Sequence, residues 1–368
     1  MTDRMGESVP SHGGNLREAA RFFGVAPESL QDFSANINPL GIPAELMALL
    51  GKELDGITHY PDPECRELVR GISSYTGFPD DWILPGNGAS EILYLLMDVM
   101  KFKRVAIPAP TFSEYAQAAA RAGSRVEWFP AAQAQDFKLD IPGLLDFLAG
   151  GFDALVLCNP NNPTSRLLSR QDLLFIMQEA EKRGLFVVVD EAFIELTHKG
   201  TAGSVAKMGW MGKNTVIIRA FTKVFAIPGL RLGYGLGHPD LMGRLRERRL
   251  PWSVNTLAQC VGEYLPMSRD FLARTCAWIG EEGPACFEAV SRIPGLLAWR
   301  PETNFMLLKL PAGLSGLEFC RRMAGKGFLV RNASNFRFLA DGFIRIAIRG
   351  REANRQMVKA MEEAVAGC

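Results

Sequence analysis

Short apolar runs alternate with amphipathic segments through the middle of the chain. Six runs are rich in β-branched residues and mostly lack internal polar positions, which is typical of strands covered on both faces. They span residues 104–108, 125–129, 154–158, 186–189, 215–220 and 233–236. Helical periodicity falls between them at 89–100, 112–121 and 169–182, with Ser169 placed to cap the last helix. This alternation predicts an α/β fold with a mostly parallel sheet.

The pattern changes after Pro251. A long helical region over 268–290 precedes expected strands at 297–299, 305–309, 328–331 and 343–348, and expected helices at 314–326 and 351–365. These elements predict a smaller α+β unit at the C-terminus. The first 35 residues contain one short amphipathic helix, 15–23, and have the character of an arm. The predicted organisation is an arm (1–35), a large domain (36–255) and a small domain (256–368).

Composition narrows the class of protein. The 368 residues are 48% apolar and 22% charged, which is enough apolar chain for a sizeable core. The net charge of +1 argues against bulk binding to nucleic acid or anionic membrane. No apolar stretch reaches the ~18–20 residues of a membrane span, and the start lacks a secretory h-region. The seven cysteines are scattered without a CxxC pair, and the four histidines form no HExxH, so we expect a cytoplasmic protein with reduced thiols and no metal site.

The loops at the carboxyl ends of the strands are the first place to look for chemistry, because ligands of open parallel sheets bind there. In the segment 85–91, Gly88 permits a tight turn, and the N–H groups of Ala89 and Ser90 open a helix and can face an anion. Taken alone, this segment is explained better by an ordinary glycine turn than by a phosphate site. Glu91 occupies the position where a dinucleotide fingerprint requires glycine, which disfavours that motif.

Three further strand-end residues carry polar chemistry. Asn162, between Asn161 and Pro163, can donate to an oxygen of a planar ligand, or it can simply form an Asx-turn. Asp190 ends a buried β-run and needs a cation beside it: a protonated ring nitrogen, a metal or an arginine, with an N-cap as the alternative. Lys223 has apolar neighbours, which would lower its pKa and make it nucleophilic unless the side chain snorkels to solvent.

Together these residues predict more than each does alone. In chain order the sequence supplies an anion-binding helix start, an Asn-Pro loop, a strand-end acid, a sequestered lysine and finally Arg231. A pyridoxal 5′-phosphate (PLP) site needs this set: a phosphate anchor, a donor to the phenolate oxygen, a partner for the pyridinium nitrogen and an amine that binds the aldehyde.

The segments NPNNPT (159–164), DEAF (190–193) and TKVFAIPGLRLGY (222–234) resemble those of the class I and II aminotransferases, fold-type I PLP enzymes, in the branch that contains the histidinol-phosphate aminotransferases. The resemblance extends over nearly the whole chain. It implies a large domain with a mostly parallel sheet and a smaller α+β C-terminal domain. Within this branch, HGGN (12–15), DFSANINP (32–39) and PWSVN (251–255) resemble the threonine-phosphate decarboxylases.

The resemblance implies roles for individual residues. Lys223 would bind PLP covalently, Asp190 would keep the ring nitrogen protonated, and both would be catalytic. The remaining cofactor-binding residues would be Asn162 at the ring oxygen O3′, Phe112 on the ring face, and Gly88, Ala89, Thr222, Arg231 and Tyr60 at the phosphate. The residues that match substrate-binding positions are His12, Gly13, Asn36, Asn162, Arg331 and Arg345.

Three consequences follow from the resemblance. Tyr60 would reach the cofactor phosphate of a neighbouring subunit, so a homodimer is implied. Phe193 stands where many relatives have a tyrosine that assists at O3′. Ala220 stands where a serine often contacts the phosphate.

The implied reaction is decarboxylation of L-threonine O-3-phosphate to (R)-1-amino-2-propanol phosphate with release of CO2, in cobalamin biosynthesis. The alternatives are decarboxylation of L-serine O-phosphate and transamination of histidinol phosphate. A third possibility is a PLP-fold binding module without turnover, which the intact Lys223 and Asp190 argue against. Motif spacing does not separate decarboxylation from transamination, because the two differ by a rotation about one substrate bond. The resemblance of the N-terminal segment favours decarboxylation.

Overall fold

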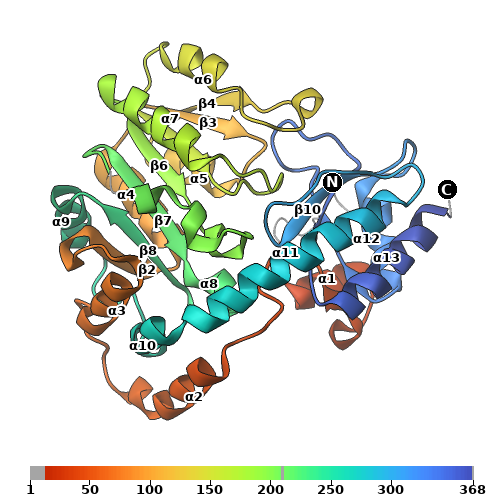
Figure 1. The fold of residues 1–368 in the computed structure, drawn as a ribbon, viewed down its shortest axis with the longest axis horizontal. Helices are drawn as coiled ribbons and strands as arrows, with labels where there is room; N and C mark the ends of the chain where they lie inside the picture. Colours follow the sequence, from red (N-terminus) through yellow and green to blue (C-terminus); the bar gives the residue numbers. More distant parts are fainter. Residues whose placement is uncertain (1–12, 209–210, 367–368) are drawn as a thin grey trace.

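A seven-stranded sheet forms the centre of the larger part of the molecule (Figure 1). The structure is a computed structural model that describes residues 13–208 and 211–366. The strand order is β2-β8-β7-β6-β5-β3-β4, and every neighbouring pair is parallel except the two that involve β8. The strands are β2 (Ile83–Asn87), β3 (Arg104–Ala109), β4 (Arg125–Pro130), β5 (Ala154–Cys158), β6 (Phe186–Asp190), β7 (Thr215–Ala220) and β8 (Leu232–Gly237). The predicted mostly parallel α/β sheet is confirmed.

Apolar side chains cover both faces of this sheet, as its continuous apolar strands require. One face packs against α4 (Ala89–Met100), α5 (Glu114–Arg121) and α9 (Pro239–Arg248). The other face packs against α3 (Arg66–Thr76), α6 (Ile141–Leu148), α7 (Arg170–Lys182) and α10 (Thr256–Tyr264). The expected cap of α7 is present, because Ser169 Oγ accepts a hydrogen bond from the Asp172 N–H at 3.0 Å.

Strand β2 is the element of this sheet that the sequence pattern did not predict. It contains Pro85 and Gly86, which are poor strand formers, and the segment was expected to be a turn. Its partner is the antiparallel strand β8, in the register Pro85 to Tyr234. Pairing with a neighbour therefore overrides the weak local propensity of the segment.

The smaller part of the molecule contains a four-stranded sheet in the order β12-β13-β10-β9, with antiparallel pairs. Its strands are β9 (Leu297–Ala298), β10 (Phe305–Lys309), β12 (Arg331–Asn332) and β13 (Phe343–Ala347). The helices around it are α11 (Arg269–Ser291), α12 (Gly316–Gly325) and α13 (Arg351–Ala366), which share its apolar core. In Figure 1, α11 runs from beside the large sheet to this smaller part.

The expectation of one strand over 328–331 is wrong. Strand β11 (Phe328–Leu329) pairs in parallel with β1 (Gln31–Asp32) from the N-terminal segment, whereas Arg331 and Asn332 pair with β13. The chain thus changes its partner at Val330. Sequence periodicity cannot reveal such a change, because the partner strand lies almost 300 residues away.

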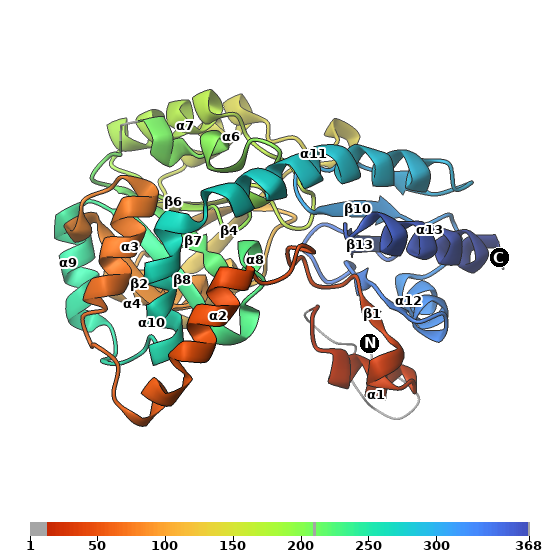
Figure 2. The ribbon, with the colours of Figure 1, turned by 60° about the horizontal axis from the view of Figure 1, so that its bottom comes forward.

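The N-terminal segment packs against the smaller part of the molecule. Helix α1 (Leu16–Phe23) begins at the cap Asn15 and contacts α12, and Figure 2 shows α1 and β1 beside α12. Helix α10, which follows residue 255, packs instead against α3 and α2 (Ala44–Lys52) of the larger part. The domain boundaries given above stay predictions. Among the described residues, no helix is long and apolar enough to cross a membrane.

Candidate active site

A cavity of about 290 Å³ lies at the carboxyl ends of the large sheet, where the smaller part of the molecule meets it. Segments from the whole length of the chain line it. The predicted site residues among its lining are Gly13, Asn36, Ala89, Phe112, Asn162, Asp190, Thr222, Lys223, Arg231, Arg331 and Arg345. The fold therefore brings eleven predicted residues from the arm, the sheet and the C-terminal part to one place.

Lys223 lies in the short helix α8 (Phe221–Val224), directly after β7. Its neighbours Phe221 and Val224 are buried, as the sequence pattern indicates. Burial lowers the pKa of the amine to about 8, with the positive charges of Arg345 and Arg231 acting in the same direction. An amine with this pKa is partly neutral near pH 7.5, and the neutral form is the nucleophile.

Asp190 ends β6 and points into the cavity. Its Oδ1 accepts a hydrogen bond from the Ala192 N–H and its Oδ2 one from the Tyr115 hydroxyl, both at 2.8 Å. Burial raises the pKa of the Asp190 carboxyl, while these two hydrogen bonds and Lys223 act to lower it. A cationic group of a ligand beside Asp190 would stabilise the carboxylate further.

The start of α4 forms an anion-binding arrangement with β8 and the lysine segment. Gly88 has φ of +80°, and a Cβ built there would lie 2.6 Å from an Arg231 guanidinium nitrogen. A Cβ on Gly233 would lie 2.3 Å from the Ala89 nitrogen, so this strand approaches the helix start closely. Thr222 and Ala89 line the cavity beside Arg231. Backbone N–H groups at a helix start, a hydroxyl and a guanidinium are the donors that a phosphate prefers.

Arg345 joins three parts of the chain at the cavity. It lies on β13, and its guanidinium donates to Asn162 Oδ1 at 2.6 Å and to the Ser34 carbonyl at 2.5 Å. Burial lowers the pKa of Arg345 to about 9, and the positive charge of Arg331 acts in the same direction. Among the described residues, no carboxylate forms an ion pair with Arg345, and its Nε has no hydrogen-bond partner.

Arg331 is the second buried arginine of the cavity. It lies opposite Arg345 in the register of β12 and β13, and it donates to Asn335 Oδ1 at 2.7 Å. Burial lowers its pKa to about 10. Two buried guanidinium groups on adjacent strands create a strongly positive wall, which suits a ligand with two anionic groups.

The N-terminal segment completes the cavity beside Arg345. A Cβ on Gly13 would lie 2.3 Å from the Ser34 carbonyl oxygen, so only glycine fits there. Asn36 is buried, and its Oδ1 has no hydrogen-bond partner within the described ranges. His12, the other residue expected in this segment, lies outside the described residues.

Two predicted cofactor residues are not in the lining of the cavity. Gly88 lies just behind it, next to Ala89. Tyr60 is on the outer surface, 84% exposed, with its ring 5.1 Å from that of Trp252. Phe193 and Ala220, which the resemblance singled out as departures, both line the cavity.

The structure adds residues that sequence reasoning missed. Tyr115 supports Asp190, Ser34 accepts from Arg345, and Asn335 accepts from Arg331. For Tyr115 a signal was present, since the expected helix 112–121 places it one turn after Phe112, which had been assigned to the site. In the structure the helix begins at Glu114, after Phe112. Ser34 and Asn335 act through a backbone carbonyl and a loop amide, for which the sequence contains no signal.

The residues present fit PLP. The buried Asn36 Oδ1 and Arg345 Nε lack partners in the described chain, and ligand groups can supply them. Gly88 leaves room beside Arg231 that a side chain would fill. A neutral amine, a buried acid and a cluster of phosphate donors match the aldehyde, the ring nitrogen and the phosphate of this cofactor. Within the described ranges, no group of three or more His, Cys, Asp or Glu side chains could hold a metal ion.

Comparisons with known proteins agree with this geometry. The family model for aminotransferase class I and II matches residues 29–361. The chain is 34% identical over 358 residues to the threonine-phosphate decarboxylase of Salmonella typhimurium, covering 97% of each chain. The chain therefore belongs to the class I and II aminotransferase family, as its motifs predicted.

Two solved structures share the fold over most of the chain. One is a histidinol-phosphate aminotransferase from Clostridium acetobutylicum, with a TM-score of 0.85, 28% identity, and coverage of 92% of this chain and 100% of that one. The other is an L-threonine-O-3-phosphate decarboxylase from Porphyromonas gingivalis, with a TM-score of 0.80, 27% identity, and coverage of 90% and 98%. Both kinds of activity that the sequence suggested thus occur on this fold.

The lowered pKa of Lys223 leads to a direct test on the protein without cofactor. Competitive acetylation with peptide mapping should give a labelling rate for Lys223 that is half-maximal near pH 8. The ε-amine of Nα-acetyl-lysine amide, added to the same reaction as a reference, should have a labelling midpoint near its ordinary pKa of about 10.4. Arg345→Met removes a positive charge that lowers the pKa, so this variant should move the Lys223 midpoint upward. A midpoint above pH 10 in the wild type would contradict the assignment.

Proposed function

We propose that this protein is a PLP-dependent decarboxylase of L-threonine O-3-phosphate, producing (R)-1-amino-2-propanol phosphate and CO2. The observation that carries the proposal is the pair of buried arginines, Arg331 and Arg345, that lines the same cavity as Lys223. The PLP phosphate already has its own donors at the start of α4, and L-threonine has only one anionic group, its carboxylate. A phosphorylated amino acid has both a phosphate and a carboxylate, and these two groups can bind the two arginines.

The cofactor would be held by groups already described. Lys223 would bind its aldehyde carbon, Asp190 its ring nitrogen, and Asn162 its O3′ oxygen. Its phosphate would lie at the start of α4, against Thr222 and Arg231. When bound, PLP supplies an electron sink for the pair released when a bond to the substrate Cα breaks.

The chain's own residues account for binding and proton transfer. Arg331 and Arg345 would bind and orient the two anionic groups of the substrate, with Asn36 and the Gly13 backbone beside them. The Lys223 amine can hold a proton at Nζ near neutral pH and deliver it to the substrate Cα. The Tyr115 hydroxyl keeps the Asp190 carboxylate in place throughout.

The decarboxylase of Salmonella typhimurium, at 34% identity over nearly the full chain, supports decarboxylation over transamination. The HGGN and DFSANINP segments support it as well, because Gly13, Ser34, Ala35 and Asn36 of these segments line the cavity. A place in cobalamin biosynthesis and a cytoplasmic location are further parts of this proposal, and both rest on the sequence resemblance.

A product assay tests the reaction. The PLP-saturated protein is incubated with L-threonine O-3-phosphate without any keto acid, and CO2 and the phosphorus-containing product are measured. We expect CO2 release and an aminoalkyl phosphate, and we expect none from Lys223→Ala, which lacks the amine. L-Serine O-phosphate should react more slowly, because a methyl group in a pocket contributes ~1–3 kcal/mol. Turnover only of histidinol phosphate, and only with a keto acid, would instead assign transamination.

Arg345 should act mainly on the substrate. Arg345→Met removes a charge-assisted hydrogen bond to the substrate. Such a bond contributes about 1.5–3 kcal/mol, so kcat/KM for L-threonine O-3-phosphate should fall about 10- to 100-fold. Arg355→Met, on the exposed side of α13, is the matched control and should leave kcat/KM within twofold. Unchanged kinetics in Arg345→Met would remove this residue from the substrate site.

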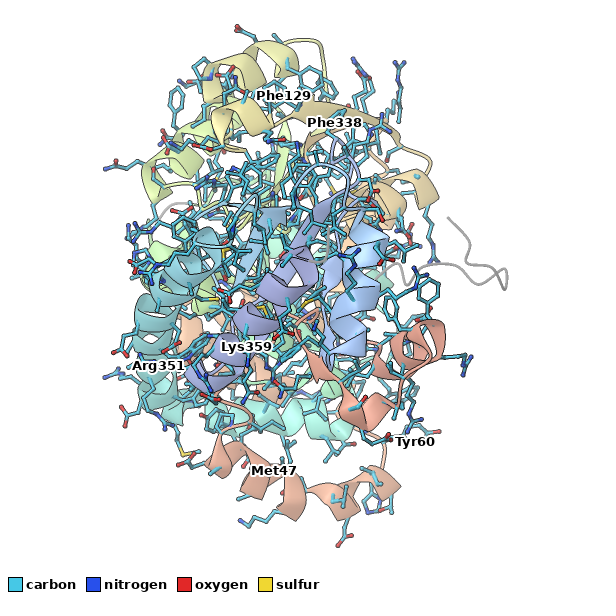
Figure 3. All side chains as sticks on the ribbon, turned by 90° about the vertical axis from the view of Figure 1, so that its right-hand side faces the viewer. Met47, Tyr60, Phe129, Phe338, Arg351 and Lys359 are labelled. Atoms are coloured by element: carbon cyan, nitrogen blue, oxygen red, sulfur yellow. The ribbon has the colours of Figure 1, made fainter. Side chains whose placement is uncertain are left out.

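A homodimer is the second part of the proposal. Large apolar side chains are exposed together on α2 and the segment that follows it, including Met47, Leu54, Ile57 at 61% and Tyr60 at 84%. Figure 3 shows Met47 and Tyr60 at the same end of the molecule. An apolar patch of this kind marks a protein interface, and a second copy of the chain would place Tyr60 near a neighbouring cavity.

Sedimentation velocity tests the dimer. The wild type should sediment at twice the chain mass, and Leu54→Asp with Ile57→Asp should produce monomers, because two charges would be buried in the interface without partners. Phe175→Asp, at a 48% exposed position on α7, is the control and should stay dimeric. A monomeric wild type at micromolar concentration would contradict the dimer.

A further inference from the structure

A second group of ionisable side chains lies directly beneath the cavity, fully buried. Its centre is Arg219 on β7, 1% exposed, and its acids are Glu191 and Glu195, at 0% and 2%. Arg219 donates to Glu191 Oε2 from Nε at 3.0 Å and from Nη2 at 2.9 Å, and its Nη1 lies 3.7 Å from Glu195 Oε1. None of the three lines the cavity, so the reaction as described does not use them.

Their positions in the chain connect them to the two catalytic residues. Glu191 follows Asp190, and Arg219 precedes Lys223 by four residues. Asp190 pairs with Ile218 in the register of β6 and β7, and the Glu191 N–H continues this ladder to the Ile218 carbonyl at 2.8 Å. The ion pair between Glu191 and Arg219 thus crosses the two strands at the point where they end.

Strand alternation separates this pair from the cavity. Successive side chains point to opposite faces, so Asp190 lies on the face of α5, where Tyr115 holds it, and Glu191 on the other face. On that other face Glu191 also accepts from the Ser204 hydroxyl at 2.6 Å and from the Val205 N–H at 3.0 Å. A backbone change that turned Asp190 out of the cavity would therefore also move Glu191 away from these partners.

The same network supports the lysine. Arg219 Nη1 contacts the Tyr234 hydroxyl at 3.4 Å, and the Tyr234 ring stacks on Phe221 with a centroid distance of 4.9 Å. Phe221 opens α8, two residues before Lys223. Tyr75 packs edge-on against Phe221 at 5.6 Å, and its hydroxyl donates to Glu195 at 3.3 Å. The aromatic side chains that pack around Phe221, at the start of the helix that contains Lys223, are thus hydrogen-bonded to Arg219 and Glu195.

We propose that Glu191 and Arg219 are positioning residues, whose ion pair fixes the carboxyl ends of β6 and β7 and thereby the placement of Asp190 relative to Lys223. Neither residue touches the cofactor or the substrate. Their contribution is geometric. The guanidinium group of Arg219, on β7, binds Glu191 at the end of β6, and this contact fixes the end of β6, which carries Asp190, against the end of β7, which leads to Lys223. The measurement of kcat in the test of this inference rests on the proposed function. The measurements of PLP affinity and of the absorption maximum require only that the protein binds PLP.

The test uses a variant that removes both charges together. Glu191→Gln combined with Arg219→Met removes the closest ion pair at nearly constant volume. Glu195 loses the charge of Arg219 in this variant but keeps the hydrogen bond from the Tyr75 hydroxyl, and burial raises the pKa of its carboxyl. The matched control is Glu282→Gln with Arg351→Met, which removes the 2.7 Å ion pair between α11 and α13, away from the cavity. For each protein, thermal melting, the Kd for PLP, the absorption maximum of bound PLP, and kcat and KM are measured.

We expect the Glu191–Arg219 double variant to fold, to bind PLP at least 5-fold more weakly with a shifted absorption maximum, and to lose at least 10-fold in kcat with KM within threefold. The control variant should match the wild type in all these measurements except melting. The single variant Arg219→Lys keeps the positive charge but loses the two-pronged guanidinium group. Its PLP affinity should therefore lie between that of the double variant and that of the wild type.

Two results would overturn the proposal. A folded double variant with PLP affinity, absorption maximum and kcat all within twofold of the wild type would show that the pair does not position the site. Loss of the folded state in this variant but not in the control would assign the pair to folding instead. If the wild type binds PLP but fails to decarboxylate L-threonine O-3-phosphate, the proposed function fails while the affinity and spectrum still decide this inference.

Discussion

The rest of this structure depends on a buried amine, Lys223, that lies near the carboxylate of Asp190 and the guanidinium groups of Arg345 and Arg231. Lys223 is flanked by apolar side chains, faces Asp190 and is influenced by the charges of Arg345 and Arg231. A buried amine in such surroundings has a lowered pKa and stays reactive, but the arginines would repel one another without anions between them. The site is therefore organised around negatively charged ligands, which the arginines require.

The topology explains how one cavity obtains such different groups. Parallel strands β5 and β6 bring Asn162 and Asp190 to the same edge of the sheet, and β7 leads into α8 with Lys223. The anion-binding donors come from the start of α4, held against the antiparallel strand β8. Strand β13 of the smaller part carries Arg345, whose hydrogen bonds to Asn162 and the Ser34 carbonyl join that part to the large sheet.

The N-terminal segment connects the two parts of the molecule beside the cavity. Strand β1 pairs with β11, and the chain then passes over the cavity at Ser34 and Asn36. Farther along, the Asn38 N–H donates to the Lys223 carbonyl at 3.1 Å, and its side-chain amide donates to the Val224 carbonyl at 2.8 Å. The segment that resembles the decarboxylases is thus fixed to the backbone at Lys223 and Val224.

The sequence by itself determined the α/β class, six strands of the large sheet to within one or two residues, and Asn162, Asp190 and Lys223 as polar residues at strand ends, which the structure brings to one cavity. These features are local, because apolar runs, turn residues and the neighbours of a side chain are all encoded within a few positions. Only the tertiary structure decided that β2 is a strand, that the chain changes partner at Val330, and that Tyr115, Ser34 and Asn335 support the site. Each of these depends on a hydrogen-bond partner far away in sequence, and such a partner leaves no periodic signal in the segment that it stabilises.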